Sequence, residues 1–350
     1  MVIGTGGSGG GSALPVLSDV ANLAGVSVST VSRVLTGRTP VSIALRARVL
    51  DAVAELGYRP NAAAQALVSG RRSTVAVLAR NTFRFGYAAT LHGIEEAARA
   101  AGMVVNIAVV ETDSPAEISR TVDLVMGQPL VGAIVIEFDS VGVSTLEAFP
   151  ESLPVVAAAG ARRRRGSRPH AFLDDAEGGR LATEYLLSLG HRTVHHLAIP
   201  STRVRSGRTQ GWRKALQDAG APVPEITQAG YSPTSGYDAA QALLDRPDVT
   251  AILCGNDEIA IGAARALQER GIRVPEDVSL VGFDDQPFAQ MWVPALTTVA
   301  QDFADLGRRT FGLLDEWVRT GERPDDSAAA PTLVIRDSAA PPRARRLLNE

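Results

Sequence analysis

Basic side chains gather at one end of this chain, and the chemistry they offer is the binding of phosphate groups. Between Val16 and Arg72 the sequence has seven arginines against Asp19, Asp51 and Glu55, a local charge of +4. Because the formal net charge of the whole chain is −3, the remainder carries −7. A small basic segment joined to an acidic body indicates nucleic-acid binding that is confined to that segment.

No arrangement of residues indicates catalysis or a metal centre. No GxSxG nucleophile elbow, P-loop or HExxH motif is found, and the five histidines lack the spacing of zinc ligands. The stretch GTGGSGGGS near the N-terminus precedes no strand–helix unit, so it does not qualify as a phosphate loop. We therefore expect no enzymatic activity, no cofactor and no metal.

Composition limits where the protein acts. Hydrophobic residues make up 45% of the 350 residues and charged residues 21%, which is typical of globular proteins with two or three domains. No apolar run approaches the ~20 residues that span a bilayer, and MVIGTGGSGGGS lacks the features of a signal peptide. The single cysteine, Cys254, fits a reducing compartment and is interpreted as an inert buried thiol. We expect a cytoplasmic protein, nucleoid-associated when bound to DNA, with no membrane contact.

Two short helices separated by a turn are predicted in LSDVANLAGVSVSTVSRVL, residues 17–35. Val20, Leu23 and Ala24 are spaced for one face of the first helix, which Gly25 would end in a left-handed conformation. Ser27 stands at the expected N-cap of the second helix. Together the two form a helix-turn-helix signature. The outer face of the second helix would carry Val28, Ser29, Ser32 and Arg33.

A third helix and a hinge-like segment follow. Ser42 is the expected cap of a helix whose apolar residues recur at helical spacing until Gly57. Residues 58–70, YRPNAAAQALVSG, then offer Asn61 as the cap of a short Ala-rich helix. Because one or two helical turns hold poorly in water, this helix is expected to fold only against a partner. An ordinary linker is the alternative.

From Thr74 onward, apolar strands alternate with helices. The expected strands are TVAVLA, MVVNIAVV, GAIVIEF, PVVAAAG, TVHHLAI, VTAILC and DVSLVGF. Their near-continuous apolar character is typical of parallel strands that are buried on both faces. The intervening helices include 87–101, 176–189, 209–219, 234–245 and 257–270. The pattern predicts two α/β lobes with ligand at the strand ends.

These segments match a known family. DVANLAGVSVSTVSRVL, then VS and a helix ending in ELGYRPNAAAQAL, resembles the DNA-binding headpiece and hinge of the LacI/GalR repressors, in detail over 16–72 and more loosely to about residue 337. The resemblance implies an N-terminal all-α helix-turn-helix headpiece and a two-lobed, periplasmic-binding-protein-like α/β core with parallel sheets. The expected divisions are a flexible tail at 1–15, the helix-turn-helix domain at 16–59, a hinge helix or linker at 60–72, an effector-binding and dimerisation core at 73–338, and a C-terminal tail at 339–350.

The resemblance implies that helix 27–35 lies in the major groove of DNA. Arg33 is the best candidate for base readout, because arginine can donate two hydrogen bonds to guanine. Leu67 occupies the position of a leucine that wedges into the minor groove in this family. Val16 stands where a capping Thr or Ser is common, which leaves the cap of the first helix open. The expected DNA-binding residues are Ser27, Val28, Ser29, Thr30, Ser32, Arg33, Asn61, Ala64 and Leu67.

The resemblance also implies a ligand between the two lobes. Arg208 stands where relatives use an arginine on the ligand, and either Asp174 or Asp175 follows the strand AFL. Carboxylates and amides suit sugar hydroxyls, and an aromatic face suits the apolar side of a ring. The expected effector-binding residues are Phe85, Tyr87, Asp174, Arg208, Asn256, Asp257, Asp284 and Gln301.

Structural roles compete for several of these residues. Asp257 could simply cap helix 258–270, Asp284 and Asp285 could form a turn, and Arg208 could be a solvated arginine. Trp212 is interpreted as core rather than as a ligand platform. The run Arg162–Arg165 is interpreted as a solvated loop rather than as a second nucleic-acid site.

The predicted function is therefore a ligand-responsive, sequence-specific transcriptional regulator that binds a near-palindromic operator as a homodimer. A repressor is favoured over an activator. A sugar or related metabolite is the expected effector by analogy with the family. The C-terminus lacks a heptad repeat, which favours a dimer over a tetramer. A solute-binding protein of a transport system, built on the same core, is the alternative.

Overall fold

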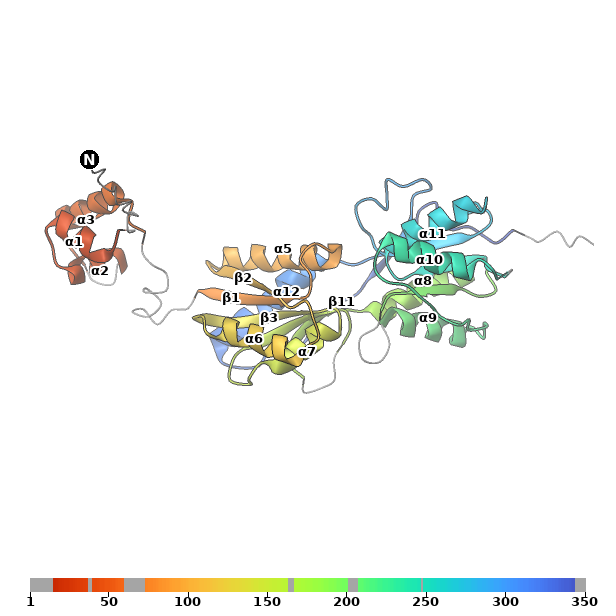
Figure 1. Ribbon diagram of the computed structural model, residues 1–350, viewed down its shortest axis with the longest axis horizontal. Coiled ribbons are helices and arrows are strands. Elements are labelled where there is room, and N and C mark those ends of the chain that lie inside the picture. The colour runs from red at the N-terminus through yellow and green to blue at the C-terminus, as the bar shows by residue number, and fades with distance from the viewer. Residues whose placement is uncertain are drawn as a thin grey trace, which may run out of the picture. The chain divides into compact units, whose positions relative to one another are not determined.

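The computed structural model describes residues 15–36, 40–59, 73–162, 167–200, 207–246 and 248–343 of the chain. Two compact units comprise residues 1–72 and 73–350 (Figure 1). Among the described residues, no helix is both long enough and apolar enough to span a membrane.

The described residues of the first unit form the helices α1 (Leu17–Ala24), α2 (Val28–Thr36) and α3 (Ile43–Leu56). Gly25 and Gly57 end α1 and α3 with φ of 62° and 60°, the left-handed region that glycine adopts without a steric penalty. A small core forms from Val20, Ala21, Ala24, Val31, Val34, Val49 and Ala52.

The structure corrects one prediction for α1, the burial of Leu23, and answers the open question of how its N-terminus is capped. Leu23, predicted on the buried face, is 46% exposed, because Ala21 faces the core instead. The N-terminus has no side-chain cap at Val16, but the Asp19 carboxylate accepts a hydrogen bond from the Val16 backbone N at 2.9 Å. This supplies one half of a capping box.

The second unit has two α/β lobes that share one plan. The first lobe contains β1 (Thr74–Ala79), α5 (Phe85–Ala100), β2 (Val104–Val109), α6 (Pro115–Met126), β3 (Leu130–Glu137), α7 (Ser140–Ala148), β4 (Val155–Ala159), β5 (His170–Leu173), α12 (Phe303–Thr320) and β11 (Ser327–Ala329). Its strands are ordered β11-β5-β4-β3-β1-β2 and are all parallel.

The second lobe repeats the order with different segments. It contains α8 (Asp175–Ser188), β6 (His195–Ala198), α9 (Gly207–Asp218), β7 (Thr227–Gln228), α10 (Pro233–Leu243), β8 (Ala251–Cys254), α11 (Asp257–Glu269), β9 (Ser279–Asp284), β10 (Thr297–Ala300) and β12 (Thr332–Val334). The strand order is β12-β10-β9-β8-β6-β7, and only the β10–β12 pair is antiparallel. The expectation of parallel sheets therefore holds except at this edge.

Helices cover both faces of each sheet because successive strand side chains point in opposite directions. In the first lobe, α5 and α12 lie on one face of the sheet and α6 and α7 on the other (Figure 1). In β1, Val75 and Val77 pack toward α5 and α12, whereas Ala76 and Leu78 pack toward α6 and α7. In the second lobe, α10 and α11 cover one face and α8 and α9 the other. Trp212 is fully buried in the latter cluster, as its interpretation as core requires.

The β2 strand is an edge strand, which its sequence does not reveal. MVVNIAVV is predicted to be buried on both faces, but β2 pairs only with β1, and Val104, Ile107 and Val109 are 60%, 51% and 44% exposed. The apolar composition of a strand indicates that its side chains are buried, but it does not indicate whether the same chain or a second chain buries them. An apolar edge that stays bare is prone to pair with other chains.

Within the described residues, the chain passes between the lobes at three places. These lie between β5 and α8, between β10 and α12, and between β11 and β12. The backbone N of Asp174 donates to the Ala329 carbonyl at 3.4 Å, which links the first crossing to the third. The crossings place Asp175 and Gln301 at the boundary between the lobes.

Candidate functional site

The outer face of α2 presents polar side chains that are already ordered. The Ser27 hydroxyl accepts from the Thr30 backbone N at 3.3 Å and lies 2.9 Å from the hydroxyls of Ser29 and Thr30. Arg33 is exposed, with its guanidinium donating to the Ser29 carbonyl and the Thr30 hydroxyl at 3.4 and 3.2 Å. These bonds hold the arginine along the helix, where it can exchange a weak intrahelical contact for a base edge.

The expected DNA-binding residues divide into two groups. Of those in α2 and its cap, Val28 is 45% exposed and Ser32 is half-buried. Asn61, Ala64 and Leu67 lie outside the described residues, so their predicted contacts with the minor groove stay predictions.

A cavity of about 230 Å³ lies between the two lobes. Its lining comes from the ends of strands, including β3, β4 and β5 in the first lobe and β8, β9 and β10 in the second. Parallel strands bring their carboxyl ends to one edge, where ligands of open α/β sheets bind. Both lobes therefore contribute side chains to one cavity.

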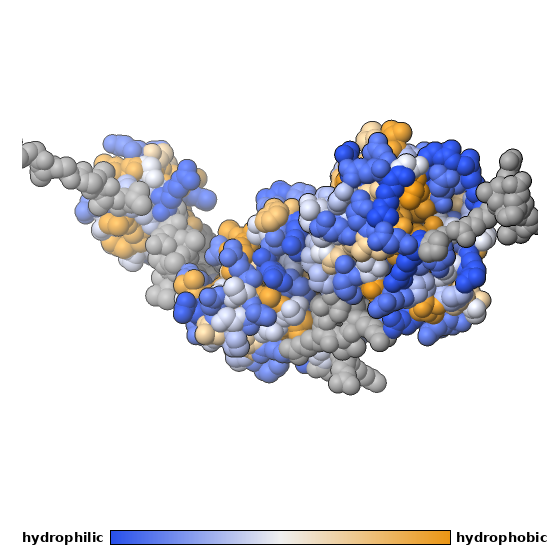
Figure 2. Space-filling view, turned by 45° about the vertical axis from the view of Figure 1, so that its right-hand side comes forward, coloured by the Kyte–Doolittle hydropathy of each residue, from blue (hydrophilic) through white to orange (hydrophobic). Residues whose placement is uncertain are grey.

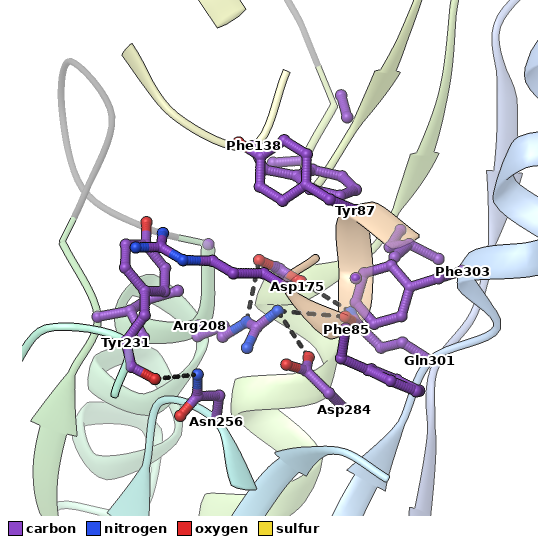
Figure 3. A pocket seen from close by; sticks show the side chains of 18 of the residues that line it. Phe85, Tyr87, Phe138, Asp175, Arg208, Tyr231, Asn256, Asp284, Gln301 and Phe303 are labelled. Carbon is purple, nitrogen blue, oxygen red and sulfur yellow. Dashed lines mark hydrogen bonds and ion pairs between the residues drawn. The ribbon is translucent and has the colours of Figure 1, made fainter. Parts of the chain in front are cut away.

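Aromatic rings form one wall of the cavity (Figure 3). Phe138 contacts Tyr87 and Phe303 edge to face, with ring centroids 5.0 and 5.8 Å apart, and Phe303 contacts Phe85 at 5.9 Å. The Tyr87 hydroxyl donates to Asp139 at 2.9 Å, which keeps that ring in place. The wall offers apolar surface that suits one side of a small ring-shaped ligand.

Arg208 occupies the polar wall and is only 7% exposed. Its Nε donates to Asp175 at 3.2 Å and one Nη to the Gln301 side-chain oxygen at 3.2 Å (Figure 3). The other Nη donates to the Gly255 carbonyl at 2.5 Å. Burial lowers the pKa of Arg208, but the charges of Asp175 and Asp284 outweigh burial and raise it above its usual range. The guanidinium therefore stays charged and anchors the network.

The network ties two crossings to each other. The Gln301 amide donates to Asp175 at 2.7 Å, and both residues also bind Arg208. Asp175 begins α8 directly after the first crossing, and Gln301 directly follows β10 at the second. A ligand that replaces any of these bonds therefore acts on the segments that join the lobes.

Asp284 sits opposite Arg208 in an unusual backbone conformation. Its φ of 100° is rare for a residue with a side chain, and an Asp284 oxygen lies 2.9 Å from an Arg208 nitrogen. That oxygen makes an ion pair but no well-aligned hydrogen bond within the described residues. Burial raises the pKa of Asp284 to about 6, against the opposing charge of Arg208. Asp284 lines the cavity, so its carboxylate can accept from a ligand hydroxyl there.

Asn256 lines the cavity but is engaged within the second lobe. Its side-chain oxygen accepts from the Ile259 backbone N at 2.8 Å and caps α11, while its amide donates to the Tyr231 carbonyl at 3.2 Å. Asn256 therefore positions Tyr231, whose side chain also lines the cavity.

Two predicted effector residues do not reach the cavity. Asp174 caps α8 by accepting from the Glu177 backbone N at 3.0 Å, and its neighbour Asp175 lines the cavity instead. Asp257 is fully buried behind the wall, where it accepts from Thr298 and from the Gln286 backbone. The predicted residues that do line the cavity are Phe85, Tyr87, Arg208, Asn256, Asp284 and Gln301.

Sequence reasoning also missed residues of the wall. Tyr231 lies in the loop between β7 and α10, and Phe303 is the first residue of α12. No local signal in the sequence distinguishes either residue from an ordinary loop or helix aromatic. Arg162 lines the cavity, whereas Arg163, Arg164 and Arg165 lie outside the described residues. Among the described residues, no group of His, Cys, Asp or Glu could hold a metal ion.

Comparisons with known proteins agree with both halves of the chain. The model of bacterial regulatory proteins of the lacI family matches residues 16–61, and that of the periplasmic binding protein-like domain matches 183–339. The transcriptional regulator DegA of Bacillus subtilis (strain 168) is 34% identical over 334 residues, which cover 92% of this chain and 97% of DegA. The chain belongs to the LacI family.

Solved structures of LacI-family proteins share its fold. A lac repressor dimer bound to operator and the anti-inducer ONPF superposes with a TM-score of 0.84 at 29% identity, over 93% of this chain and 99% of that one. A complex of the regulator CelR with cellobiose has a TM-score of 0.68 at 31% identity, over 93% and 100%. This LacI-family chain is a DNA-binding transcriptional regulator with a periplasmic-binding-protein-like core.

Proposed function

We propose that this LacI-family protein represses transcription by binding a near-palindromic operator as a homodimer, and that a sugar or sugar derivative in the cavity controls its affinity for DNA. The network of Arg208, Asp175 and Gln301 carries the proposal. The network joins the cavity wall to two of the segments that connect the lobes. A ligand in the cavity would therefore change the hydrogen bonds that set how the two lobes are arranged relative to each other.

The DNA-binding half of the proposal rests on the exposed face of α2. Val28, Ser29 and Arg33 are solvent-accessible in the free protein. Lac repressor, to which the chain is similar over 93% of its length, was solved on its operator. Arg33 would read a guanine, while the hydroxyls of Ser27 and Thr30 would position the helix on phosphates.

Dimerisation is supported by apolar surface on each lobe. In the first lobe this surface is the β2 edge, with Val104, Ile107 and Val109 exposed. In the second lobe, Met291 and Val293 are 77% and 88% exposed, and Figure 2 shows apolar side chains grouped in patches on an otherwise hydrophilic surface. A second copy that covers both patches would bring two headpieces to a two-fold site.

The chemistry of the cavity supports a polyhydroxylated effector. The aromatic wall can pack against a sugar ring, while the Asp284 carboxylate can accept from a hydroxyl. CelR, whose structure is similar to this chain, was solved with cellobiose. Coupling of about 1–3 kcal/mol between this site and the headpiece would change DNA affinity roughly 5–150-fold.

A two-step experiment tests the proposed function. A thermal-shift screen of the full chain against sugars and sugar derivatives should give a ligand that, at about 100 times its Kd, stabilises the core by about 2.7 kcal/mol. Operator DNA selected from a random library should then bind with an affinity that this ligand changes. Arg208→Ala should keep specific DNA binding and lose the response. A variant that still responds at the same ligand concentration would refute the assigned site.

A further inference from the structure

Arg84, at the start of α5, is an arginine in the cavity wall that no acidic side chain neutralises within the part of the chain that the structure describes. Its guanidinium carbon lies 4.4 Å from the centroid of the Tyr231 ring. Two other arginines nearby are paired, since Arg80 lies 3.5 Å from Asp139 and Arg208 is held by Asp175. Arg84 therefore keeps its charge available to a ligand.

The surroundings of Tyr231 are positively charged. Burial is the main cause that raises the pKa of Tyr231, and the charges that act on it are those of Asp139 and three arginines, Arg80, Arg84 and Arg208. Asp139 is already bound by Tyr87 and Arg80. The other acidic side chains of the lining are Glu137, Asp175, Glu258 and Asp284, and of these Asp175 and Asp284 are paired with Arg208.

A partly buried cation without a partner is costly when a ligand displaces the water around it. A neutral ligand in this cavity would remove water from Arg84 and return no charge. A carboxylate or phosphate would instead form charge-assisted hydrogen bonds with the guanidinium, which presents a planar set of donors suited to either group. The free-energy cost of desolvating Arg84 therefore favours anionic ligands over neutral ones.

We propose that the effector carries an anionic group, a carboxylate or a phosphate, that binds Arg84 beside Tyr231 while its hydroxyl groups bind Asp284. This inference rests on the proposed function and narrows its ligand class to sugar acids or sugar phosphates. It also gives the aromatic wall a partner, because the remaining ring carbons can pack on Phe138 and Phe303.

Calorimetric titration of the full chain with matched sets of ligands tests the inference. Each set contains a neutral sugar, the corresponding sugar acid and the corresponding sugar phosphate, built on glucose, galactose and ribose. For the skeleton that binds, an anionic member should bind about tenfold or more tightly than the neutral one. Whether the carboxylate or the phosphate binds more tightly identifies the anionic group.

Variants separate a charge effect from a change of shape. Arg84→Gln should abolish the preference for the anionic member, and Arg84→Lys should retain most of it. Arg99→Gln is the matched control, because Arg99 lies on the same helix but is 69% exposed and paired with Glu95. A preference that survives in Arg84→Gln, or equal binding of neutral and anionic members, would overturn the inference.

The outcomes also distinguish this inference from the proposed function. If only neutral sugars bind and change operator affinity, the proposed function stands and the anionic effector is wrong. If no member of any set binds while selected DNA still does, both the anionic effector and the sugar class are wrong. Anionic ligands that bind with the Arg84 dependence but leave operator affinity unchanged would support the site and contradict its regulatory role.

Discussion

At the residue scale, Asp257 explains how the cavity wall keeps its shape. One carboxylate oxygen accepts from the Gln286 backbone N at 2.7 Å and the other from the Thr298 hydroxyl at 2.6 Å. These bonds hold the chain where β9 ends, at which Asp284 and Asp285 have φ of 100° and 49°. Asp257 therefore acts on the effector site through Asp284, and does not contact the cavity itself.

The buried carboxyl of Asp257 predicts a pH dependence of stability. Burial raises its pKa to about 8, opposed by the Thr298 hydrogen bond. Because the folded-state pKa lies above the ordinary value, folding binds a proton, and this contribution is fully present at low pH. It is lost as pH rises toward about 8, at up to about 1.4 kcal/mol per pH unit.

Asp257→Asn should remove this dependence, because asparagine is neutral and can still accept from Gln286 and donate to Thr298. Urea unfolding between about pH 5 and 8 should give a flatter profile for Asp257→Asn than for the unaltered chain. Asp238→Asn, an exposed change, should leave the profile intact. Parallel profiles for all three proteins would show that Asp257 is ionised throughout.

At the element scale, glycines let helices approach closely enough to build the site. A Cβ on Gly179 would overlap the backbone of Arg208, and one on Gly211 would overlap the Ala176 carbonyl. The resulting contact between α8 and α9 brings Asp175 within 3.2 Å of Arg208. The α10–α11 and α5–α12 pairs use the same device, through Gly236 and Gly262 in one pair and Gly93 and Gly307 in the other.

Two glycines on α12 give a matched test of this packing. Gly307→Ala should destabilise the core by about 1–3 kcal/mol or more, because the new methyl group would meet the Thr90 carbonyl. Gly312→Ala meets nothing within 4 Å and should be neutral or stabilising by up to about 1 kcal/mol. Denaturant unfolding measures both, and equal effects would contradict the role of close approach.

At the scale of the whole molecule, regulation needs a second copy. The cavity network sets how the two lobes of one chain are joined, but a near-palindromic operator responds only if two headpieces are held together. The bare β2 edge and the exposed Met291 and Val293 are the surfaces proposed to hold them. The proposed dimer contacts and the cavity would then involve the same two lobes, so a ligand in the cavity would change how the two subunits are held together.

Ile107→Lys should shift the protein from dimer to monomer and weaken operator binding. Ile107 is 51% exposed on the edge strand, where lysine is compatible with folding but opposes a partner's apolar surface. Sedimentation velocity measures the change, with Val223→Lys as the control, since Val223 is 39% exposed in a loop of the second lobe. If Ile107→Lys remains a stable dimer, the dimer interface does not include the β2 edge.

Local features of the chain were readable from the sequence. Helix ends at Gly25, Gly57, Gly102, Gly190, Gly220 and Gly271 all have positive φ, because a glycine that ends a helix depends on its own backbone and its immediate neighbours. The apolar runs likewise predicted strands, and the motif around α2 predicted the headpiece. Each of these inferences depends on residues within about two helical turns of one another.

Only the tertiary structure decided which side chains face the cavity. Asp174 and Asp175 are adjacent acidic residues that follow β5. Asp174 caps the N-terminus of α8, whereas Asp175, the first residue of α8, accepts a hydrogen bond from Arg208. Asp257 follows a strand end as a ligand residue would, yet the segment after β9 covers it. The sequence by itself determined the headpiece helices and the strands β1, β2, β3, β4, β6, β8 and β9, because those follow from local spacing. The site depends on where strand ends from two lobes meet, and that is a property of long-range packing.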